Sequence, residues 1–196
     1  MSRNTSILHQ LFLAILLVVM ASALTNIRDS VADEISLHAH QSEFGDSTID
    51  TRELVSRAKT FLSILSETEQ EQLLYPIDSP QWKVWSNFNH SSSRVGLRIG
   101  SLTEAKFDSV LAVLRSALST QGLDNVTTIM KLNSVLGLMR KNTERFNEDN
   151  YFLIMFGLPD ANSRWGFQLE GHHLALHYAV KNDEVVMSPV FGALNL

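Results

Sequence analysis

Residues 165–180 (WGFQLEGHHLALHYAV) decide the fold that this 196-residue chain is expected to adopt. Apolar and polar side chains alternate along most of this stretch, as they do in half-buried β-strands, and Gly171 marks a point where one strand can end. Residues 151–156 before it and 184–187 after it also have the length and apolar content of strands, with turn residues at 181–183. The C-terminal part of the chain is therefore predicted to form a mostly antiparallel sheet.

The part of the chain before these strands shows helical periodicity. Apolar residues spaced three and four apart predict a helix that begins near Thr51 and continues to Leu65. Residues 66–69 (SETE) have the form of a capping box, in which a serine and a glutamate satisfy each other's backbone N–H groups. They predict a short second helix.

Longer helices are predicted further along the chain. Residues 101–104 (SLTE) repeat the capping-box form and predict a helix that ends near Gly122. Residues 125–141 predict another long helix, whose buried side includes Val135 and Met139. With helices first and antiparallel strands second, the predicted fold class is α+β, in which about three long N-terminal helices pack on the sheet.

The first 23 residues have the features of a secretory signal peptide. Arg3 is basic, residues 11–20 (LFLAILLVVM) are apolar, and small side chains follow at Ala21 and Ala23, so cleavage is predicted after Ala23. The mature protein is therefore expected to be secreted or periplasmic. It is expected to have no stable membrane span, because no other stretch has the roughly twenty apolar residues of a spanning helix.

Residues 24–50 are polar and lack periodicity, so they are expected to form a flexible leader before a single domain over residues 51–196. His38 and His40 lie two residues apart in this leader and can share a metal ion in an extended chain. The alternative interpretation is that both are simply solvated.

Composition narrows the classes of function. The chain has 16 Lys and Arg, 21 Asp and Glu and a formal net charge of −5, which argues against binding to nucleic acid. It has no cysteine, which excludes disulfides and cysteine-ligated zinc or iron–sulfur sites. The sequence also lacks the motifs of serine hydrolases, P-loop enzymes and dinucleotide-binding enzymes.

The segment Glu170-Gly171-His172-His173 carries the residue types most suited to chemistry. On a continuous strand, Glu170 and His172 would share one face about 6–7 Å apart, close enough to converge on one metal ion or substrate. His173 and His177 would share the other face, about 13 Å apart. In an enzyme, Glu170 and His172 would be the catalytic residues, with Glu170 as a ligand or general base. His172 and His173 would hold zinc or copper, which activates water or supports redox chemistry. The alternative is that the histidines cap strand ends.

A second candidate site lies in residues 82–94, where aromatic and polar side chains are interleaved. Trp85, Asn87 and Arg94 are candidates to bind a small molecule, a glycan or a peptide. Indoles line such grooves, and a guanidinium can bind one carboxylate or phosphate through two parallel hydrogen bonds. Trp165 is a further candidate from the strand region. In the alternative interpretation, the indoles pin this segment to the core, Arg94 forms an ion pair and Trp165 belongs to the core.

Five segments carry a resemblance to a known family: residues 85–88 (WSNF), 95–97 (VGL), 151–159, 165–174 (WGFQLEGHHL) and 188–193 (SPVFGA). The chain resembles the family of domain of unknown function 3500. The resemblance implies an exported protein of unestablished activity. It also implies that the family's hallmark segment includes Trp165, Gly166, Glu170, Gly171, His172 and His173.

The chain departs from similar proteins in two places. His177 lies where they tend to have asparagine, which argues against a role as a ligand. They also continue well beyond the match at residues 191–193, whereas this chain ends at Leu196, so the resemblance implies that a C-terminal part is missing.

Three functions therefore stay open at the level of the sequence. The first is an exported metal-dependent enzyme that uses the Glu170–His173 segment. The second is a non-catalytic module that binds a glycan or a peptide near Trp85. The third is a truncated copy without activity.

Overall fold

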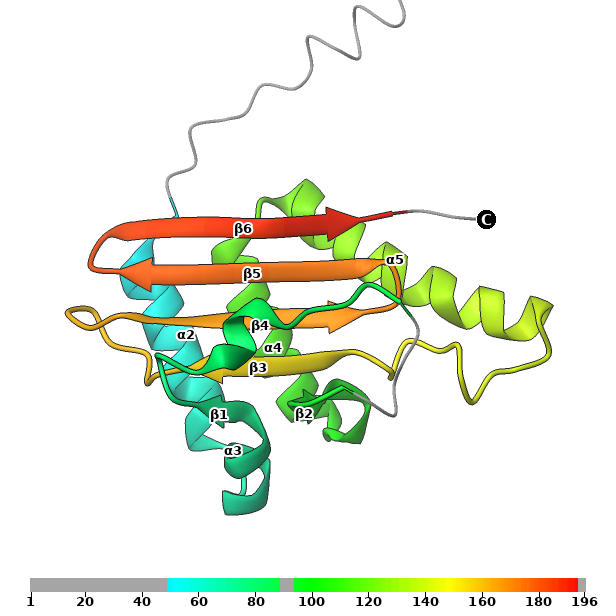
Figure 1. The fold of residues 1–196 in the computed structure, drawn as a ribbon, viewed down its shortest axis with the longest axis horizontal. Helices are drawn as coiled ribbons and strands as arrows, with labels where there is room; N and C mark the ends of the chain where they lie inside the picture. The colour runs from blue at the N-terminus through cyan, green and yellow to red at the C-terminus, as the bar shows by residue number, and fades with distance from the viewer. Residues whose placement is uncertain (1–48, 89–93, 194–196) are drawn as a thin grey trace, which may run out of the picture. The chain divides into compact units, whose positions relative to one another are not determined.

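The computed structural model describes residues 49–88 and 94–193, in which the helices precede most of the strands along the chain (Figure 1). The helices are α2 (Thr51–Ser63), α3 (Glu67–Leu73), α4 (Glu104–Ala117) and α5 (Thr120–Met139). The strands are β1 (Leu74–Tyr75), β2 (Leu97–Arg98), β3 (Phe152–Phe156), β4 (Trp165–Gly171), β5 (Leu174–Lys181) and β6 (Glu184–Gly192). Two short 3₁₀ helices, η1 (Pro80–Lys83) and η3 (Ile99–Ser101), lie between β1 and α4. The predicted α+β class is confirmed.

The predicted signal peptide lies outside the described residues. So does the predicted leader up to residue 48, which includes His38 and His40. Within the described ranges, none of the helices is long and apolar enough to cross a membrane.

The described strands form one six-stranded sheet in which β1, β3, β4, β5 and β6 are neighbours in that order. The four strands from β3 to β6 pair antiparallel. The two short strands both pair with β3: β1 runs parallel to its end, and β2 runs antiparallel to its beginning. Residues 172–173 join β4 to β5, and residues 182–183 join β5 to β6, the latter at the predicted turn.

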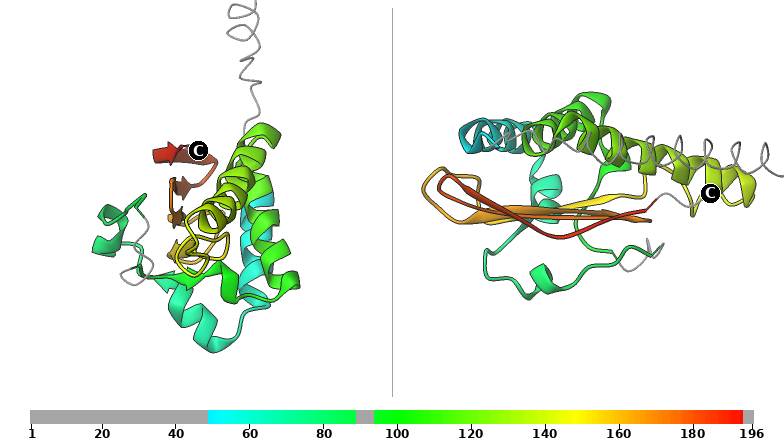
Figure 2. Two further views of the ribbon diagram at one scale, coloured as in Figure 1. Left: turned by 90° about the vertical axis from the view of Figure 1, so that its right-hand side faces the viewer. Right: turned by 90° about the horizontal axis from the view of Figure 1, so that it is seen from above.

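One face of the sheet packs against α2, α4 and α5 (Figure 2). Alternate residues of β4 and β5 point to this side, so Trp165, Phe167 and Tyr178 are almost completely buried. The rings of Phe167 and Tyr178 stack with their centroids 4.6 Å apart. Leu54 and Phe61 of α2 are buried in the same core. Each such side chain contributes about 1.5–3 kcal/mol by leaving water, which holds the helices on the sheet.

Of the two predicted capping boxes, the one at α3 is confirmed and the one at α4 is wrong. Ser66 and Glu69 form the predicted reciprocal capping box of α3. The box predicted at residues 101–104 is wrong, because Thr103 is the N-cap of α4 and its side chain makes no capping bond. Ser101 Oγ instead donates to the Arg98 carbonyl at 2.6 Å.

Two further expectations about the long helices are wrong. The helix expected to end near Gly122 ends at Ala117, because Ser119 starts α5 by accepting a hydrogen bond from the Gly122 N–H at 3.1 Å. Val135 and Met139, expected to be buried, are 44% and 71% exposed, since the C-terminal end of α5 extends past the strands (Figure 1).

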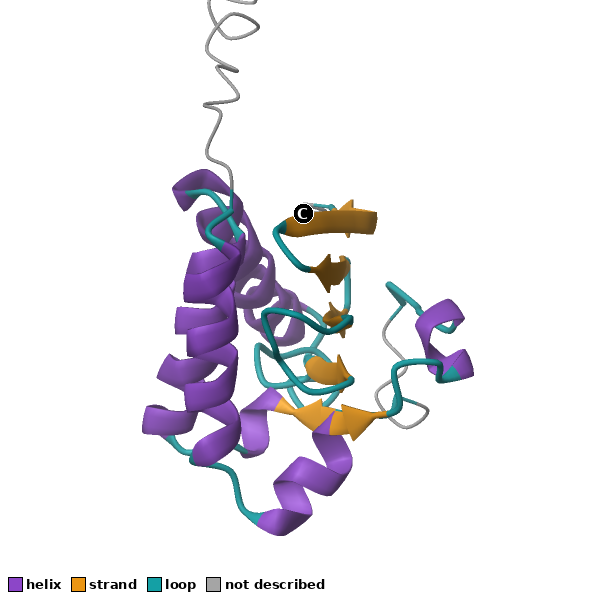
Figure 3. Ribbon diagram, turned by 90° about the vertical axis from the view of Figure 1, so that its left-hand side faces the viewer, coloured by secondary structure: helices purple, strands orange, loops and turns teal. Residues whose placement is uncertain are grey.

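The other face of the sheet is covered by the described part of the β1–β2 connection, residues 76–88 and 94–96, which we call the flap (Figure 3). Trp82 of η1 stacks on Phe156 of β3 with ring centroids 3.9 Å apart. Gly166 of β4 permits this approach, because a Cβ there would lie 2.5 Å from the Trp82 ring. The flap and the helices thus lie on opposite faces of β4 and β5.

Candidate functional site

The two histidines of the Glu170–His173 segment form a turn, not part of a strand. β4 ends at Gly171 and β5 begins at Leu174, so His172 and His173 connect the two strands. His173 has a φ of 62°, in the left-handed region that glycine and asparagine occupy more readily. The expected alternation of faces along a continuous strand is therefore wrong.

Glu170 lies on the flap side of the sheet, where both of its carboxylate oxygens are engaged. Oε2 accepts hydrogen bonds from Arg94 Nη1 at 3.0 Å and from the Ser86 N–H at 3.3 Å. Oε1 lies 3.1 Å from His177 Nε2. The Arg94 and Glu170 side chains are only 6% and 11% exposed, so this ion pair is buried.

Arg94 connects the flap to the sheet with the rest of its guanidinium. Its Nη2 donates to the carbonyls of Ser86 and Phe88, both at 2.6 Å. Burial lowers the pKa of Arg94, and the charge of Glu170 opposes that shift. Because Arg94 donates to a buried carboxylate and two carbonyls of the protein, it holds the flap in place.

His177 completes the network, and its neighbours determine its tautomer. Gln168 Nε2 donates to the Trp82 carbonyl at 3.2 Å and lies 2.8 Å from His177 Nδ1. A carbonyl only accepts, so the amide nitrogen must face it, which makes His177 Nδ1 an acceptor. His177 Nε2 then carries the proton and donates to Glu170.

This role of His177 differs from the expectation drawn from the sequence, which argued against His177 as a ligand and gave it no other partner. A two-residue turn at residues 172–173 pairs Gln168 with His177 across the two antiparallel strands, as the structure does. Predicting that turn from the sequence would therefore have placed these two side chains next to each other. Placing the break at Gly171 alone does not determine that register.

His172 points to the helical side of the sheet, away from Glu170. Its Nδ1 lies 2.8 Å from Asn133 Oδ1 of α5, and Asn133 Nδ2 donates to the Asn147 carbonyl at 2.7 Å. The Asn133 oxygen therefore faces His172 and accepts from Nδ1–H, which leaves the Nε2 lone pair without a partner among the described residues. Burial lowers the pKa of His172 to about 4, with further contributions from His173 and Arg140, so the ring is neutral at pH 7.

His173 lies against His172, with ring centroids 3.9 Å apart. Its backbone N–H donates to the Asn87 carbonyl of the flap at 2.8 Å. Its Nδ1 is buried and has no hydrogen-bond partner in the described part of the chain, and burial lowers its pKa. The turn thus presents two imidazoles with lowered pKa values.

A cavity of about 10 Å³ lies beside these two rings. Its remaining lining comes from α5 and from the residue that follows β6: Ile129, Leu132, Asn133, Leu136 and Ala193. A space of this size is comparable to the volume that one water molecule needs. Within residues 49–88 and 94–193, no group of three or more His, Asp or Glu side chains could hold a metal ion.

The flap brings the second predicted cluster to the same end of the sheet. Trp85 is 41% exposed and meets His177 edge-on at 6.2 Å. Asn87 and Arg94 contact the Glu170–His173 segment through the hydrogen bonds described above. Trp165 does not join them, because it is 1% exposed within the core at the other end of β4.

The part of the chain that forms this site matches one protein family. The model of a family described as "Protein of unknown function (DUF3500)" matches residues 47–195, which include the flap and the His172-His173 turn. Neither the curated proteins nor the solved structures include a match to this chain. The expectation drawn from the sequence resemblance is confirmed: the chain belongs to the DUF3500 family, whose function is unknown.

Proposed function

We propose that this is an exported metal-binding protein in which His172 and His173 are ligands of a zinc or copper ion. The observation that carries the proposal is the way His172 is held. Its Nδ1–H is anchored by the buried amide of Asn133, and Nε2 keeps its lone pair. Metal-ligating histidines are typically oriented in this way, by donating the other ring N–H to a carbonyl or carboxylate oxygen.

The neighbouring ring supports the same proposal. His173 occupies a strained backbone conformation and has a buried nitrogen without a partner. Strain of this kind persists where the surrounding structure enforces it and is concentrated at functional sites. Neutral imidazoles are suitable ligands for zinc and copper, and a metal ion with only two protein ligands has positions left for water or a substrate. Hydrolysis or redox chemistry is therefore the proposed class of reaction.

Glu170 takes a different role from the one expected of it. Its oxygens are engaged by Arg94, Ser86 and His177 on the face of the sheet opposite to the His172 ring. We therefore assign Glu170 to positioning the flap, and not to ligating the metal or acting as a general base.

The test is the metal content of the purified protein, measured by elemental mass spectrometry after loading with zinc or copper and extensive dialysis. Near-stoichiometric metal is expected, and His172→Gln and His173→Asn together should remove it while the circular dichroism spectrum is kept. His38→Ala with His40→Ala is the matched control, because it removes another closely spaced pair. The proposal would be refuted if the His172→Gln/His173→Asn protein retained the metal, or if the wild-type protein retained none.

A second candidate function is favoured by one specific observation. Trp85 is 41% exposed, and Val84 and Phe88 of the same flap segment are 59% and 67% exposed. A partly exposed indole is suited to stacking on a sugar or an apolar peptide side chain. Trp165 is buried and Trp82 is stacked on Phe156, so quenching of tryptophan fluorescence by soluble glycans or peptides would report mainly on Trp85. Quenching should disappear with Trp85→Ala.

A further inference from the structure

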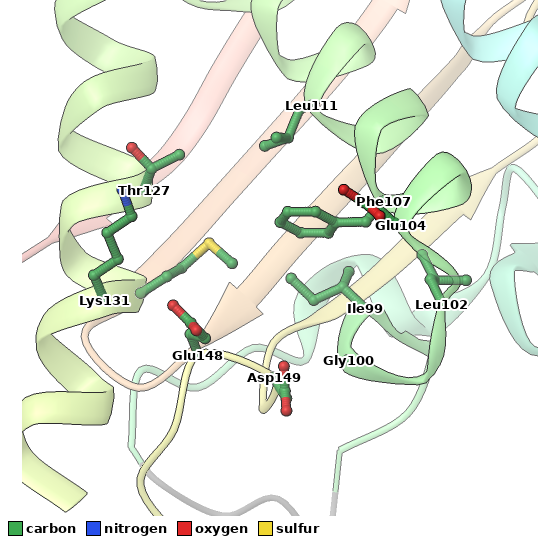
Figure 4. A pocket seen from close by; sticks show the side chains of 11 residues that line it. Ile99, Gly100, Leu102, Glu104, Phe107, Leu111, Thr127, Lys131, Glu148 and Asp149 are labelled. Atoms are coloured by element: carbon green, nitrogen blue, oxygen red, sulfur yellow. The ribbon is translucent and has the colours of Figure 1, made fainter. Parts of the chain in front are cut away.

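A cavity of about 500 Å³ opens between α4, α5 and the chain that leads into β3 (Figure 4). Its apolar lining is buried or half-buried: Ile99, Leu102, Phe107, Leu111 and Met130. Its charged lining is exposed: Glu104, Lys131, Glu148 and Asp149. The cavity therefore has an apolar interior and a charged rim. Its volume is in the range of sites that hold small organic molecules.

The rim is negative. Its charged side chains are three carboxylates, those of Glu104, Glu148 and Asp149, and one cation, Lys131. Lys131 extends along α5 toward Thr127, away from Glu148 (Figure 4). None of the three carboxylates makes a hydrogen bond or ion pair with another residue in the described part of the chain. They are therefore free to meet a positive charge on a bound molecule.

The backbone holds two of these carboxylates in place. The Gly100 N–H donates to the Asp149 carbonyl at 3.2 Å, and a Cβ at Gly100 would lie 2.7 Å from that oxygen, so only glycine permits this close packing. The Glu148 N–H donates to Ser134 Oγ of α5 at 2.9 Å. Both positions are thus fixed before any ligand arrives, which reduces the entropy lost on binding.

We propose that this cavity binds a small molecule that has an apolar body and a protonated amine. The body packs between Phe107 and Met130, and the ammonium group lies at Glu148 and Asp149. Because the rim is exposed, its charges are screened by water, and the amine should bind about three- to tenfold tighter than a neutral molecule of the same shape. The proposal does not depend on the metal site, which lies at His172 and His173.

The test uses three probes with one apolar body: tryptamine, tryptophol and indolepropionic acid, which are a cation, a neutral alcohol and an anion. Their binding is followed by NMR of isotope-labelled methionine methyl groups, with the Met130 signal assigned from Met130→Leu. Tryptamine is expected to shift this signal at the lowest concentration. Glu148→Gln with Asp149→Asn should weaken tryptamine about three- to tenfold and leave tryptophol unchanged.

The matched control is Asp124→Asn with Glu144→Gln, which removes two exposed carboxylates outside the lining and should change nothing. Equal affinity for tryptamine and tryptophol would overturn the proposed specificity. Absence of any Met130 shift with all three probes would overturn the site itself, as would an unchanged tryptamine affinity in the Glu148/Asp149 variant.

Discussion

Replacing Arg94 with alanine is the sharpest test of how the flap is held on the sheet. The change removes the guanidinium that pairs with Glu170 at 3.0 Å and donates to the Ser86 and Phe88 carbonyls. The carboxylate left behind is only 11% exposed, so water does not replace the lost charge. Removing one partner of a buried ion pair typically destabilises a protein by about 3–5 kcal/mol.

The expected loss lies toward the lower end of that range. Glu170 keeps its hydrogen bonds from His177 and from the Ser86 N–H, which still stabilise part of its charge. We therefore expect Arg94→Ala to lower the free energy of unfolding by about 3 kcal/mol. Glu170→Gln in the Arg94→Ala background should have a smaller effect than in the wild type, because the two side chains interact directly. A coupling energy of about 1.5–3 kcal/mol is expected from the double-mutant cycle.

The assay is urea unfolding followed by circular dichroism and by tryptophan emission, to which Trp82 and Trp85 of the flap contribute together with Trp165 of the core. With a typical slope of about 1–3 kcal/mol per molar urea, the midpoint should fall by about 1–3 M. Arg57 and Glu53 on α2 provide a control cycle, since this ion pair is 52% exposed on each side and should couple by less than about 0.5 kcal/mol. If Arg94→Ala were no more destabilising than Arg57→Ala, the conclusion that Arg94 holds the flap on the sheet would be refuted.

Three further predictions concern the turn between β4 and β5. The free energy of unfolding should fall as the pH drops from 6.5 to about 4, because unfolded His172 takes up a proton at its ordinary pKa of 6.5 whereas the native ring stays neutral. Since the ring is only partly buried, the loss should be about 1–2 kcal/mol, and His172→Gln should flatten the dependence in urea titrations at several pH values. Gly171→Ala should destabilise the domain by about 3 kcal/mol, because its Cβ would overlap the Tyr151 ring, whereas Gly192→Ala should change stability by less than about 1 kcal/mol; similar unfolding midpoints would contradict this. His173→Asn should keep or raise the thermal midpoint, because asparagine tolerates its φ of 62° better, while metal binding is lost; a large fall in the midpoint would show that the histidine is structural.

Most elements of the fold could be predicted because their signals are local. The helix that begins at Thr51, the capping box at Ser66 and the strand at residues 152–156 all follow from spacing within a few turns or residues. The errors arose where two local signals competed. Ser101 and Thr103 both precede α4, and the N-cap position falls to Thr103 because Ser101 Oγ donates to the Arg98 carbonyl instead.

The candidate site was less predictable, because its contacts join distant parts of the chain. Glu170 and Arg94 are 76 residues apart, and His172 and Asn133 are 39 residues apart. The residue types marked these side chains as candidates. Which face of the sheet a side chain occupies, however, depends on the residue at which the strand ends, and β4 ends at Gly171, before His172. The expected grouping of Glu170 with His172 failed for this reason.

By itself, the sequence determined the α+β class, the family and the residues worth testing, because composition, periodicity and motif depend on neighbours along the chain. The tertiary structure decided the partners. Packing the flap on one face of the sheet and α5 on the other assigned Glu170 to Arg94 and His177, and His172 to Asn133. Such pairings depend on strand register and on which element covers which face, and these are determined only when the whole domain is packed.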